Sequence, residues 1–382
     1  HDTAVKPPAG CGVNSQAASG KTGCVDTLMH AFARIKGHAK ARGATMHEAL
    51  FYQTADENQV RCDLCHHRCR IAEGKRGLCG VRQNQAGKLY SLVYGKIIAE
   101  HVDPIEKKPL FHFLPGSKAY SIGTVGCNFR CKHCQNFEIS QAPRLGSGRI
   151  RGEPRTPDQI VAAARAAGCQ SIAYTYTEPT IFFEFAADTM LLAHRAGIKN
   201  VFVSNGYMGA AAARRIAPLL DAVNIDLKAF TEKFYREICG ARMKPVLETI
   251  ALMKALGVWL EVTTLVIPGL NDSEGELAEI AGFVKGVGTE VPWHVSAFFP
   301  AYQLMDVPPT PVGTLRRARD IGLEAGLGYV YEGNVPGESG AHTTCPGCGA
   351  VVIARSGRGS VRNRLQQGRC PECGQRIEGV GL

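Results

Sequence analysis

Cysteine is the residue type in this chain that stands out for its chemistry. The 382 residues include 15 cysteines, and most of these form three tight clusters. Clustered cysteines in a chain of this size indicate metal binding, whereas disulfide frameworks are typical of short secreted proteins. The clusters are Cys62, Cys65, Cys69 and Cys79; then Cys127, Cys131 and Cys134; then Cys345, Cys348, Cys370 and Cys373.

The central cluster supplies three thiolates from one short loop, with the spacing Cys127-x₃-Cys131-x₂-Cys134. A [4Fe–4S] cube held entirely by protein takes four cysteine ligands. Three ligands leave one iron open to a substrate or a cofactor. The alternative is a zinc site that His133 completes.

The last cluster consists of two CPxCG turns, which contain Cys345 with Cys348 and Cys370 with Cys373. Each turn presents two thiolates, and glycine allows the backbone to fold toward the sulfurs. Two such turns predict a closed tetrahedral Cys₄ zinc site of the structural kind. A rubredoxin-type iron is the alternative.

The first cluster, Cys62-x₂-Cys65-x₃-Cys69-x₉-Cys79, is compatible with two metal centres. Four thiolates could hold zinc or an auxiliary iron–sulfur cluster, and His66 or His67 could replace one thiolate. The glycine-rich loop between Cys69 and Cys79 and the polar residues near it favour zinc.

Regular elements begin at residue 119, where short apolar runs alternate with helical segments. This alternation predicts an α/β fold with a parallel sheet and right-handed crossovers, arranged as a partial (β/α)₆ barrel. The expected strands are 119–124, 171–176, 201–204, 222–226, 260–267 and 293–297. The expected helices are 157–167, 181–196, 209–220, 245–256, 274–284 and 314–325, and a short strand follows at 328–331.

Polar, ligand-competent residues finish every expected strand. Parallel α/β sheets carry their chemistry where the strands end, so one end of this sheet is expected to be a site. The candidates are Glu178, Ser204, Asn205, Asp226, Lys228, the segment VIPGLND that contains Ile267, and His294. Glu178 and Asp226 could instead cap helices, and His294 could be a hydrogen-bonded core residue.

The segment CNFRCKHC at 127–134 resembles the CxxxCxxC signature of radical SAM enzymes, which share a six-stranded partial barrel. The resemblance implies that the open iron chelates S-adenosylmethionine (SAM). One electron through the cluster would then cleave SAM to methionine and a 5′-deoxyadenosyl radical that abstracts hydrogen. The protein would hold and shield this chemistry.

The same resemblance implies roles for the strand-end residues. Glu178 in TYTEPT matches the acid that binds the methionine amino group, although Tyr176 and Thr177 replace the family's two glycines. Lys228, in an Asp-x-Lys pattern with Asp226, is a candidate for the SAM carboxylate. By the same match Ser204 and Asn205 lie near the ribose, Ile267 and His133 near adenine, and His294 faces the pocket.

Residues 46–382 resemble the AmmeMemoRadiSam-system radical SAM enzymes, relatives of the pyruvate formate-lyase activating enzymes. The resemblance rests on VRCDLCHHRC, GLCGVR, DPIEKKPLFHFLPGS, PWHVSAFFP, YVYEGNVPG and the terminal ribbon. It implies Memo-like partner proteins and a one-electron donor such as flavodoxin or ferredoxin. The activating enzymes with extra clusters insert cysteines after the core motif, and 135–168 contains none. We therefore expect a SAM-dependent hydrogen-abstracting enzyme with an unidentified substrate, and glycyl-radical activation of a partner enzyme is the alternative. We expect substrate contacts at Tyr174, Tyr176, Glu332 and Asn334.

The sequence also predicts a division of the chain. Residues 1–45 are expected to be a disordered basic extension with one short helix near 28–35. Residues 46–118 form a Cys-rich module and a connection, 119–340 the core, and 341–382 a zinc-ribbon-like module. Of the net charge of +10, the segments 1–45 and 345–382 carry +4 each, so the body offers little for nucleic acid to bind.

The composition also bears on where the protein is located and on which other classes of protein it could belong to. No run of apolar residues is long enough for a membrane span, and the N-terminus lacks the apolar segment of a signal peptide. We therefore expect a cytoplasmic protein. A non-enzymatic zinc-binding regulatory protein is the alternative from another class, and an electron carrier would need fully ligated clusters and no cofactor pocket.

Overall fold

The computed structural model describes residues 46–56, 58–145, 148–335, 339–356 and 360–382. The chain divides into two compact units, 1–45 and 46–382. The helix expected near 28–35 lies outside the described residues. All of the elements described below belong to the second unit.

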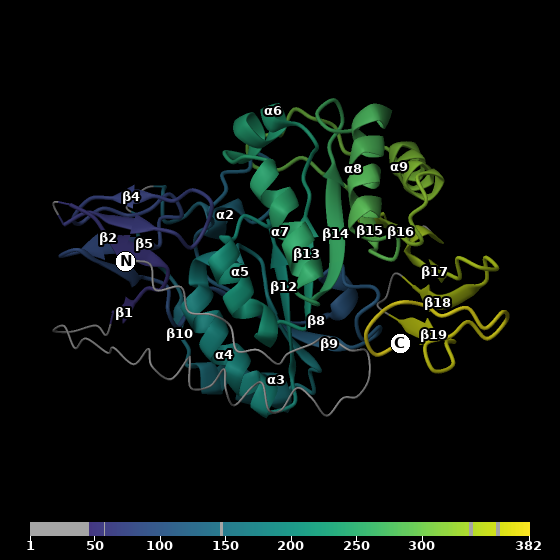
Figure 1. Cartoon of the computed structure of the whole chain (residues 1–382), viewed down its shortest axis with the longest axis horizontal. Coiled ribbons are helices and arrows are strands. Elements are labelled where there is room, and N and C mark those ends of the chain that lie inside the picture. The colour runs from purple at the N-terminus through teal and green to yellow at the C-terminus, as the bar shows by residue number, and fades with distance from the viewer. Residues whose placement is uncertain (1–45, 57, 146–147, 336–338, 357–359) are drawn as a thin grey trace. The chain divides into compact units, whose positions relative to one another are not determined.

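An eight-stranded sheet forms the centre of this unit (Figure 1). Seven of its strands are parallel and follow one another across the sheet in chain order, and β8 joins the outer edge of β9 in the antiparallel sense. Chain-order neighbours connected by helices are the arrangement of a barrel wall. The strands are β8 (Ala99–Pro104), β9 (Lys118–Gly123), β11 (Ser171–Tyr174), β12 (Lys199–Ser204), β13 (Ala222–Asp226), β14 (Trp259–Val266), β15 (Trp293–Ala297) and β16 (Val330–Gly333).

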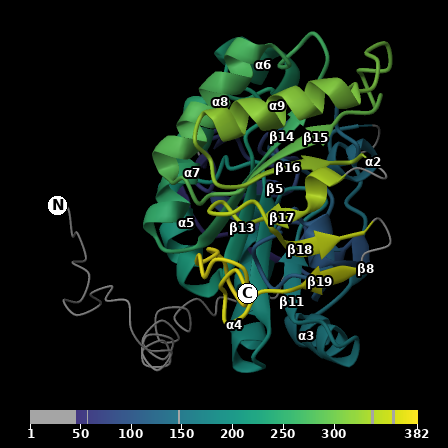
Figure 2. The ribbon, with the colours of Figure 1, turned by 90° about the vertical axis from the view of Figure 1, so that its right-hand side faces the viewer.

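The helices between these strands wrap around the outside of the sheet (Figures 1 and 2). Side chains cap the first turns of two of them: Thr156 and Gln159 form a reciprocal cap on α3, and the Ser273 hydroxyl accepts from the Glu276 amide of α8. The helices are α3 (Pro157–Ala166), α4 (Phe183–Arg195), α5 (Ala210–Ile216), α7 (Lys244–Ala255), α8 (Glu274–Val287) and α9 (Val312–Glu324). Shorter helical turns are η1 (Ile105–Lys107), α2 (Phe137–Ser140), η2 (Pro179–Phe182), η3 (Ala217–Leu219), α6 (Glu232–Phe234), the π-helical η4 (Tyr235–Cys239) and η5 (Ser339–Ala341).

The expected α/β fold is confirmed, and the sheet is larger than the six strands of the prediction. The short strand expected at 328–331 is β16, which extends the parallel set by one. Residues 99–104, where a strand-like stretch passes into the expected connection at 101–118, form β8. Its proline, Pro104, is the last residue of an edge strand, where a missing N–H costs no hydrogen bond to a neighbouring strand.

Two small sheets make up the N-terminal Cys-rich module, which Figure 1 shows at the left of the central sheet. A buried ion pair joins this module to the barrel: Arg82 of β5 donates to both oxygens of Glu184 on α4, at 2.9 and 3.2 Å. The strands are β1 (His47–Glu48), β5 (Arg82–Gln85) and β6 (Lys88–Ser91) in one sheet, and β2 (Tyr52–Thr54), β3 (Val60–Cys62) and β4 (Arg70–Ile71) in the other. β7 (Lys96–Ile97) pairs with β10 (Glu153–Pro154).

The segment after β8 closes the amino-terminal end of the barrel. Ile105, Leu110 and Phe113 pack against residues near the starts of the strands, among them Ala119 and Ala222. A chemical site inside the barrel is therefore expected at the opposite end, where the carboxyl ends of the parallel strands lie.

The C-terminal module packs beside the segment between β8 and β9, residues 105–117, which we call the plug. The module is a three-stranded sheet of β17 (Thr343–Thr344), β18 (Val351–Arg355) and β19 (Val361–Asn363). Phe111 of the plug and Tyr331 of β16 share one hydrophobic cluster with Val352 and Ile353 of this sheet. The Arg355 guanidinium also donates to the Phe111 carbonyl at 2.6 Å. Of the described helices, none is long and apolar enough to cross a lipid bilayer.

Candidate active site

Cys127, Cys131 and Cys134 lie on the loop that follows β9, at the carboxyl end of the sheet. The Phe129 amide donates to the Cys127 sulfur at 3.3 Å, and the Ser140 hydroxyl lies 3.2 Å from the Cys134 sulfur. Hydrogen bonds of this kind stabilise a thiolate over a thiol. The loop is therefore suited to hold metal-binding sulfurs.

The π-helical turn η4 fixes this loop from the side. The Arg130 amide donates to the Cys239 carbonyl at 2.8 Å, and the Lys132 amide to the Ile238 carbonyl at 2.9 Å. The Arg144 guanidinium binds the carbonyls of Cys127 and Phe129 from the other side. Most of the loop's backbone position is thus set by groups outside it.

The distances between the sulfurs distinguish this loop from a zinc site. A zinc ion with Zn–S bonds of about 2.3 Å holds four sulfurs about 3.8 Å apart. Among the residues that the structure describes, only the C-terminal set brings three or more potential ligands within 4.8 Å of one another. The three thiols of the Cys127 loop do not meet this limit together. As three thiolate donors on one loop, the residues fit three corners of a [4Fe–4S] cluster.

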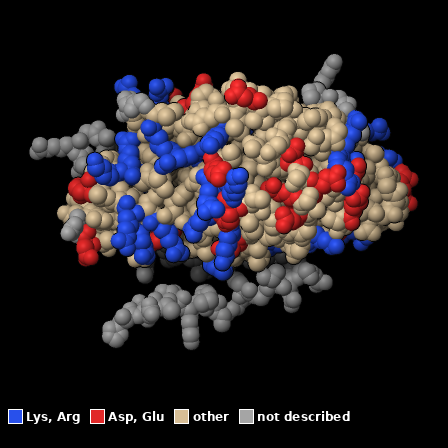
Figure 3. All heavy atoms as spheres, turned by 90° about the horizontal axis from the view of Figure 1, so that it is seen from above, with Lys and Arg blue, Asp and Glu red and all other residues tan. Residues whose placement is uncertain are grey.

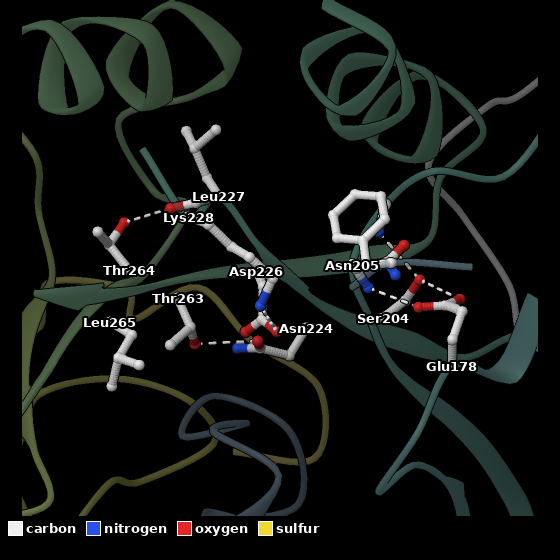
Figure 4. Close-up of polar contacts among 12 residues, drawn as sticks. Glu178, Ser204, Asn205, Asn224, Asp226, Leu227, Lys228, Thr263, Thr264 and Leu265 are labelled. Atoms are coloured by element: carbon white, nitrogen blue, oxygen red, sulfur yellow. Dashed lines mark hydrogen bonds and ion pairs between the residues drawn. The ribbon is translucent and has the colours of Figure 1, made fainter. Parts of the chain in front are cut away.

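Glu178 ends the second parallel strand and is almost fully buried. Its two oxygens accept from the Ser204 hydroxyl and the Asn205 amide, both at 2.8 Å, and from the amide and hydroxyl of Thr180 (Figure 4). Burial raises the pKa of Glu178, and these hydrogen bonds act against that rise. Glu178 also caps η2. The helix-cap role is therefore compatible with the expected role of its carboxylate in the site.

Asn205 links this acid to the sulfur loop. Its side-chain amide donates to the Asn128 side-chain oxygen at 2.7 Å and lies 3.8 Å from the Cys127 sulfur. Glu178, Ser204, Asn205 and Cys127 therefore form one continuous group, as the sequence predicted for residues at neighbouring strand ends.

Asp226 and Lys228 form the second group at this end of the sheet. Their side chains are 2.9 Å apart, and Figure 4 shows Lys228 turned back toward Asp226. Burial lowers the pKa of Lys228, but Asp226 and the sulfurs of Cys131 and Cys239 outweigh it, and the pKa lies well above its ordinary value. Lys228 is thus a cation held next to the sulfur loop.

His133 belongs to this second group. Burial, with Lys228 nearby, lowers the pKa of His133 to about 3, so the ring is neutral. Its Nδ1 atom is buried and has no hydrogen-bond partner in the described part of the chain. A neutral ring with a free nitrogen beside the sulfurs is available to a bound ligand.

The structure does not bring every predicted residue to this end. His294 is the second residue of β15; its Nε2 lies 2.7 Å from the buried carboxylate of Glu261, and its ring stacks with Tyr331. Tyr174 is fully buried, with its hydroxyl bonded to Asn200 beneath the helices. Ile267, by contrast, follows β14 and does lie at this end. It is buried and donates its amide to the Asn271 side chain, which in turn donates to the Lys228 carbonyl.

Several residues of the site carried no sequence signal. The Cys239 thiol lies next to that of Cys131 and raises its pKa, although the two are far apart in the chain and nothing in the spacing marks Cys239. Tyr176 donates to Asp103 at 2.8 Å, and the same carboxylate pairs with Lys108 at 2.8 Å. Asp103 and Lys108 come from the stretch that the sequence left as a connection.

The four thiols of the C-terminal module are arranged as zinc requires. Cys345 and Cys373 are 3.5 Å apart, and Cys348 and Cys370 are 3.7 Å apart. These separations match the sulfur spacing of a tetrahedral zinc site. The four cysteines come together as the sequence predicted and could hold one metal ion, and zinc as that ion stays a prediction.

Basic side chains gather on one face of the protein, over its left and centre as Figure 3 shows it. At this end of the barrel a groove lies beside the sulfur loop and is lined by Tyr207, Arg236 and Arg242 among others. The Arg242 guanidinium binds the His66 carbonyl at 3.3 Å, and the side chain of Arg130 runs past Gly240. The groove therefore has a positive rim.

A sequence model of the Radical SAM superfamily matches residues 121–281. The chain is 46% identical over 336 residues to the uncharacterized protein MJ0808 of Methanocaldococcus jannaschii, covering 87% of this chain and 99% of that protein. It is 26% identical over 156 residues to an isethionate sulfite-lyase activating enzyme of Nitratidesulfovibrio vulgaris, covering 37% of this chain and half of that enzyme.

Among solved structures, a domain of the pyruvate-formate lyase-activating enzyme of Bacteroides vulgatus is similar with a TM-score of 0.37 and 16% identity. That similarity covers 43% of this chain and 99% of the domain. The three-thiol loop, the chain-order parallel sheet and the superfamily match agree with one another, and they favour an enzyme over a zinc-binding regulatory protein. The chain belongs to the radical SAM superfamily of enzymes and is related to its activating enzymes.

Proposed function

We propose that Cys127, Cys131 and Cys134 hold a [4Fe–4S] cluster whose fourth iron binds SAM, and that the enzyme abstracts hydrogen from a substrate still to be identified. The observation that supports this most is the pairing of the sulfur loop with two charged groups. Glu178 reaches Cys127 through Asn205, and Lys228 lies beside Cys131. A zwitterionic ligand on the open iron would meet both charges.

The carboxylate of Glu178 suits the amino group of such a ligand. Two of its four donors are hydroxyls, those of Thr180 and Ser204, which can rotate away when an ammonium group arrives. A charge-assisted hydrogen bond is stronger than the neutral one that it replaces. Glu178 would therefore orient the ligand at one end.

Lys228 suits the carboxylate of the ligand at the other end. In this structure its charge is matched by Asp226 at 2.9 Å, so a second carboxylate would share an ammonium group that is already held in place. Ser204, Asn205, Ile267 and His133 keep their expected cofactor contacts as part of this proposal, whereas His294 does not, because it is bonded to Glu261 in the first half of β15. When bound, the cluster and SAM would supply the hydrogen-abstracting radical.

The substrate would enter at the carboxyl end of the barrel. Tyr176, which is held by Asp103 in the sparsely populated region at φ +66°, stands close to Glu178 in the chain. Glu332 and Asn334 lie at the end of the last parallel strand and are the other two expected contacts that stay in this proposal, whereas Tyr174 is fully buried and leaves it. A substrate seated against these residues would keep water from a reactive radical.

The positive groove suits the electron donor. Flavodoxins and ferredoxins carry acidic surfaces, and opposite charges steer association between proteins. We propose that a donor of this kind docks at the groove lined by Arg236 and Arg242. Memo-like partner proteins and a cytoplasmic location remain predictions that rest on the family resemblance.

A glycyl-radical activating enzyme is the second candidate, and the similarity to an isethionate sulfite-lyase activating enzyme favours it. It differs from the first candidate in its substrate, which would be a backbone glycine of a partner enzyme. Both candidates share the chemistry at the sulfur loop.

The test is the substitution Cys131→Ala in the reconstituted full chain. It removes one of three ligands, and we expect it to abolish reductive cleavage of SAM, measured as 5′-deoxyadenosine formed. Cys169→Ala is the matched control, since Cys169 is buried and lies outside the clusters. Cleavage by Cys131→Ala at the wild-type rate would overturn the proposal.

A further inference from the structure

The first cysteine set shares one pocket beside the Cys127 loop. Its lining includes Cys62, Cys65, Cys69 and Cys79. Backbone amides point at all four sulfurs, from Leu64, His67, Leu78 and Val81; that of Leu78 lies 3.5 Å from the Cys69 sulfur. Each of the four sulfurs thus has its own backbone donor, which acts against the rise in thiol pKa that burial causes.

Histidine is not needed to complete this set. His67 lines the cysteine pocket, but its Nε2 atom is bonded to the Asn128 carbonyl at 2.8 Å and so faces away from the sulfurs' own ligand. His66 lines the positive groove and does not line the cysteine pocket. The ligand set is thus four cysteines, which suits either zinc or a cubane cluster.

The distances between the sulfurs favour one of these two metal centres over the other. Within the described ranges, no three of the four thiols lie within 4.8 Å of one another, whereas the C-terminal set of the same chain meets this limit with sulfurs 3.5 and 3.7 Å apart. The first set shares its wider spacing with the Cys127 loop. Because a cube spreads its thiolates over four separate irons, the wider spacing favours a cluster.

The surroundings of the pocket agree with this. Leu64, Ile71 and Ile181 line it and are almost fully buried, so bound sulfide would be shielded from water. Arg82 also lines the pocket and is fully buried, next to the sulfurs of Cys62 and Cys79. A cluster with four thiolates is an anion, which a buried cation stabilises.

The pocket also adjoins the Cys127 loop. A Cβ atom added to Gly126 would lie 3.0 Å from the Cys79 carbonyl and 2.6 Å from Val81. Arg144 lies between the two sulfur sets: it holds the Cys127 carbonyl, it is near the sulfurs of both Cys79 and Cys127, and its Nε and one Nη have no hydrogen-bond partner among the described residues. A one-electron centre in the pocket would therefore be adjacent to the first one.

We infer that Cys62, Cys65, Cys69 and Cys79 bind a [4Fe–4S] cluster, in place of the zinc that the sequence favoured, and that this cluster exchanges single electrons with the centre on the Cys127 loop. One electron from a low-potential donor protein reduces the cluster from the 2+ to the 1+ state, and its transfer restores the 2+ state without forming or breaking bonds. This assignment does not depend on how SAM is bound.

The experiment uses the full chain with the substitutions Cys127→Ala, Cys131→Ala and Cys134→Ala, reconstituted anaerobically with iron and sulfide. We expect about four irons and about four sulfides per chain, as one [4Fe–4S] cluster contains. We also expect a reduced-state EPR signal that SAM does not change, and one zinc per chain from the C-terminal set. Because this variant lacks the proposed SAM-binding centre, its result is independent of the proposed function.

A second variant guards against loss of folding. Cys69→Ala on the same background removes one ligand that is only half-buried. It should lose the remaining signal and iron while keeping the circular dichroism spectrum and the single zinc. Two zincs and no iron in the first variant, or one zinc and no iron, would each overturn the inference, as would a signal that survives Cys69→Ala.

Discussion

Removing the buried cation that joins the N-terminal module to the barrel should be strongly destabilising. Arg82 donates to both oxygens of Glu184 and, at 2.6 Å, to the Leu50 carbonyl, and the side chains of Arg82 and Glu184 are each 2% exposed. Arg82→Met leaves the Glu184 charge buried without its cation. Breaking a buried pair in this way costs about 3–5 kcal/mol.

A surface arginine provides the matched control. Arg317 also contacts two carboxylates, Glu274 and Glu324, but its side chain is 42% exposed. Exposed pairs contribute little to stability, so Arg317→Met should leave the free energy of unfolding close to that of the wild type. The assay is urea unfolding of the two variants and the wild type at equal metal content, followed by circular dichroism.

The difference between the two variants decides the outcome. We expect Arg82→Met to lower the free energy of unfolding by at least about 2 kcal/mol more than Arg317→Met. Equal losses would mean that Arg82 is solvated in solution, and the docking of the N-terminal module on α4 (Phe183–Arg195) would be refuted.

Three further predictions concern the separate sites. Cys370→Ser should cost the chain one zinc and make residues after 341 sensitive to protease, whereas Cys169→Ser should do neither; zinc retained by Cys370→Ser would contradict the ribbon assignment. Glu178→Gln should weaken SAM binding about 10-fold or more in calorimetry at unchanged iron content, and equal affinity would remove Glu178 from the site. The double substitution Arg236→Glu/Arg242→Glu should slow reduction by flavodoxin at low salt but not by dithionite. Arg165→Glu, on exposed α3, is its control, and an equal effect of both would argue against the groove.

The parallel sheet was the part of the structure that local patterns predicted best. Strands such as β13 (Ala222–Asp226) and β15 (Trp293–Ala297) have the bounds expected from their runs of apolar residues. The polar residues that end them, among them Asp226 and Lys228, meet because parallel strands end at one edge. Here sequence order and spatial order coincide.

Contacts between distant segments had no such signal. Arg82 and Glu184 are 102 residues apart, and neither side chain reveals its partner in the sequence. β8 was hidden by its proline and its charged residues. His294 looked like a strand-end residue, but its position in the first half of β15 and its bond to Glu261 depend on the register between strands.

The kind of metal centre at the first cysteine set also could not be predicted from local sequence patterns. Spacing along the chain tells which cysteines act together, but zinc and a cubane cluster accept similar spacings. The distances between the sulfurs distinguish the two, and these distances are set by how β3 (Val60–Cys62) and the loop before β5 (Arg82–Gln85) are packed.

The most direct test of the central claim is EPR spectroscopy of the reconstituted, dithionite-reduced full chain, recorded anaerobically with and without SAM. We predict a [4Fe–4S]⁺ signal that shifts when SAM is added, because one iron of the cluster on Cys127, Cys131 and Cys134 is open. A fully reconstituted protein whose spectrum is the same with and without SAM would contradict this claim.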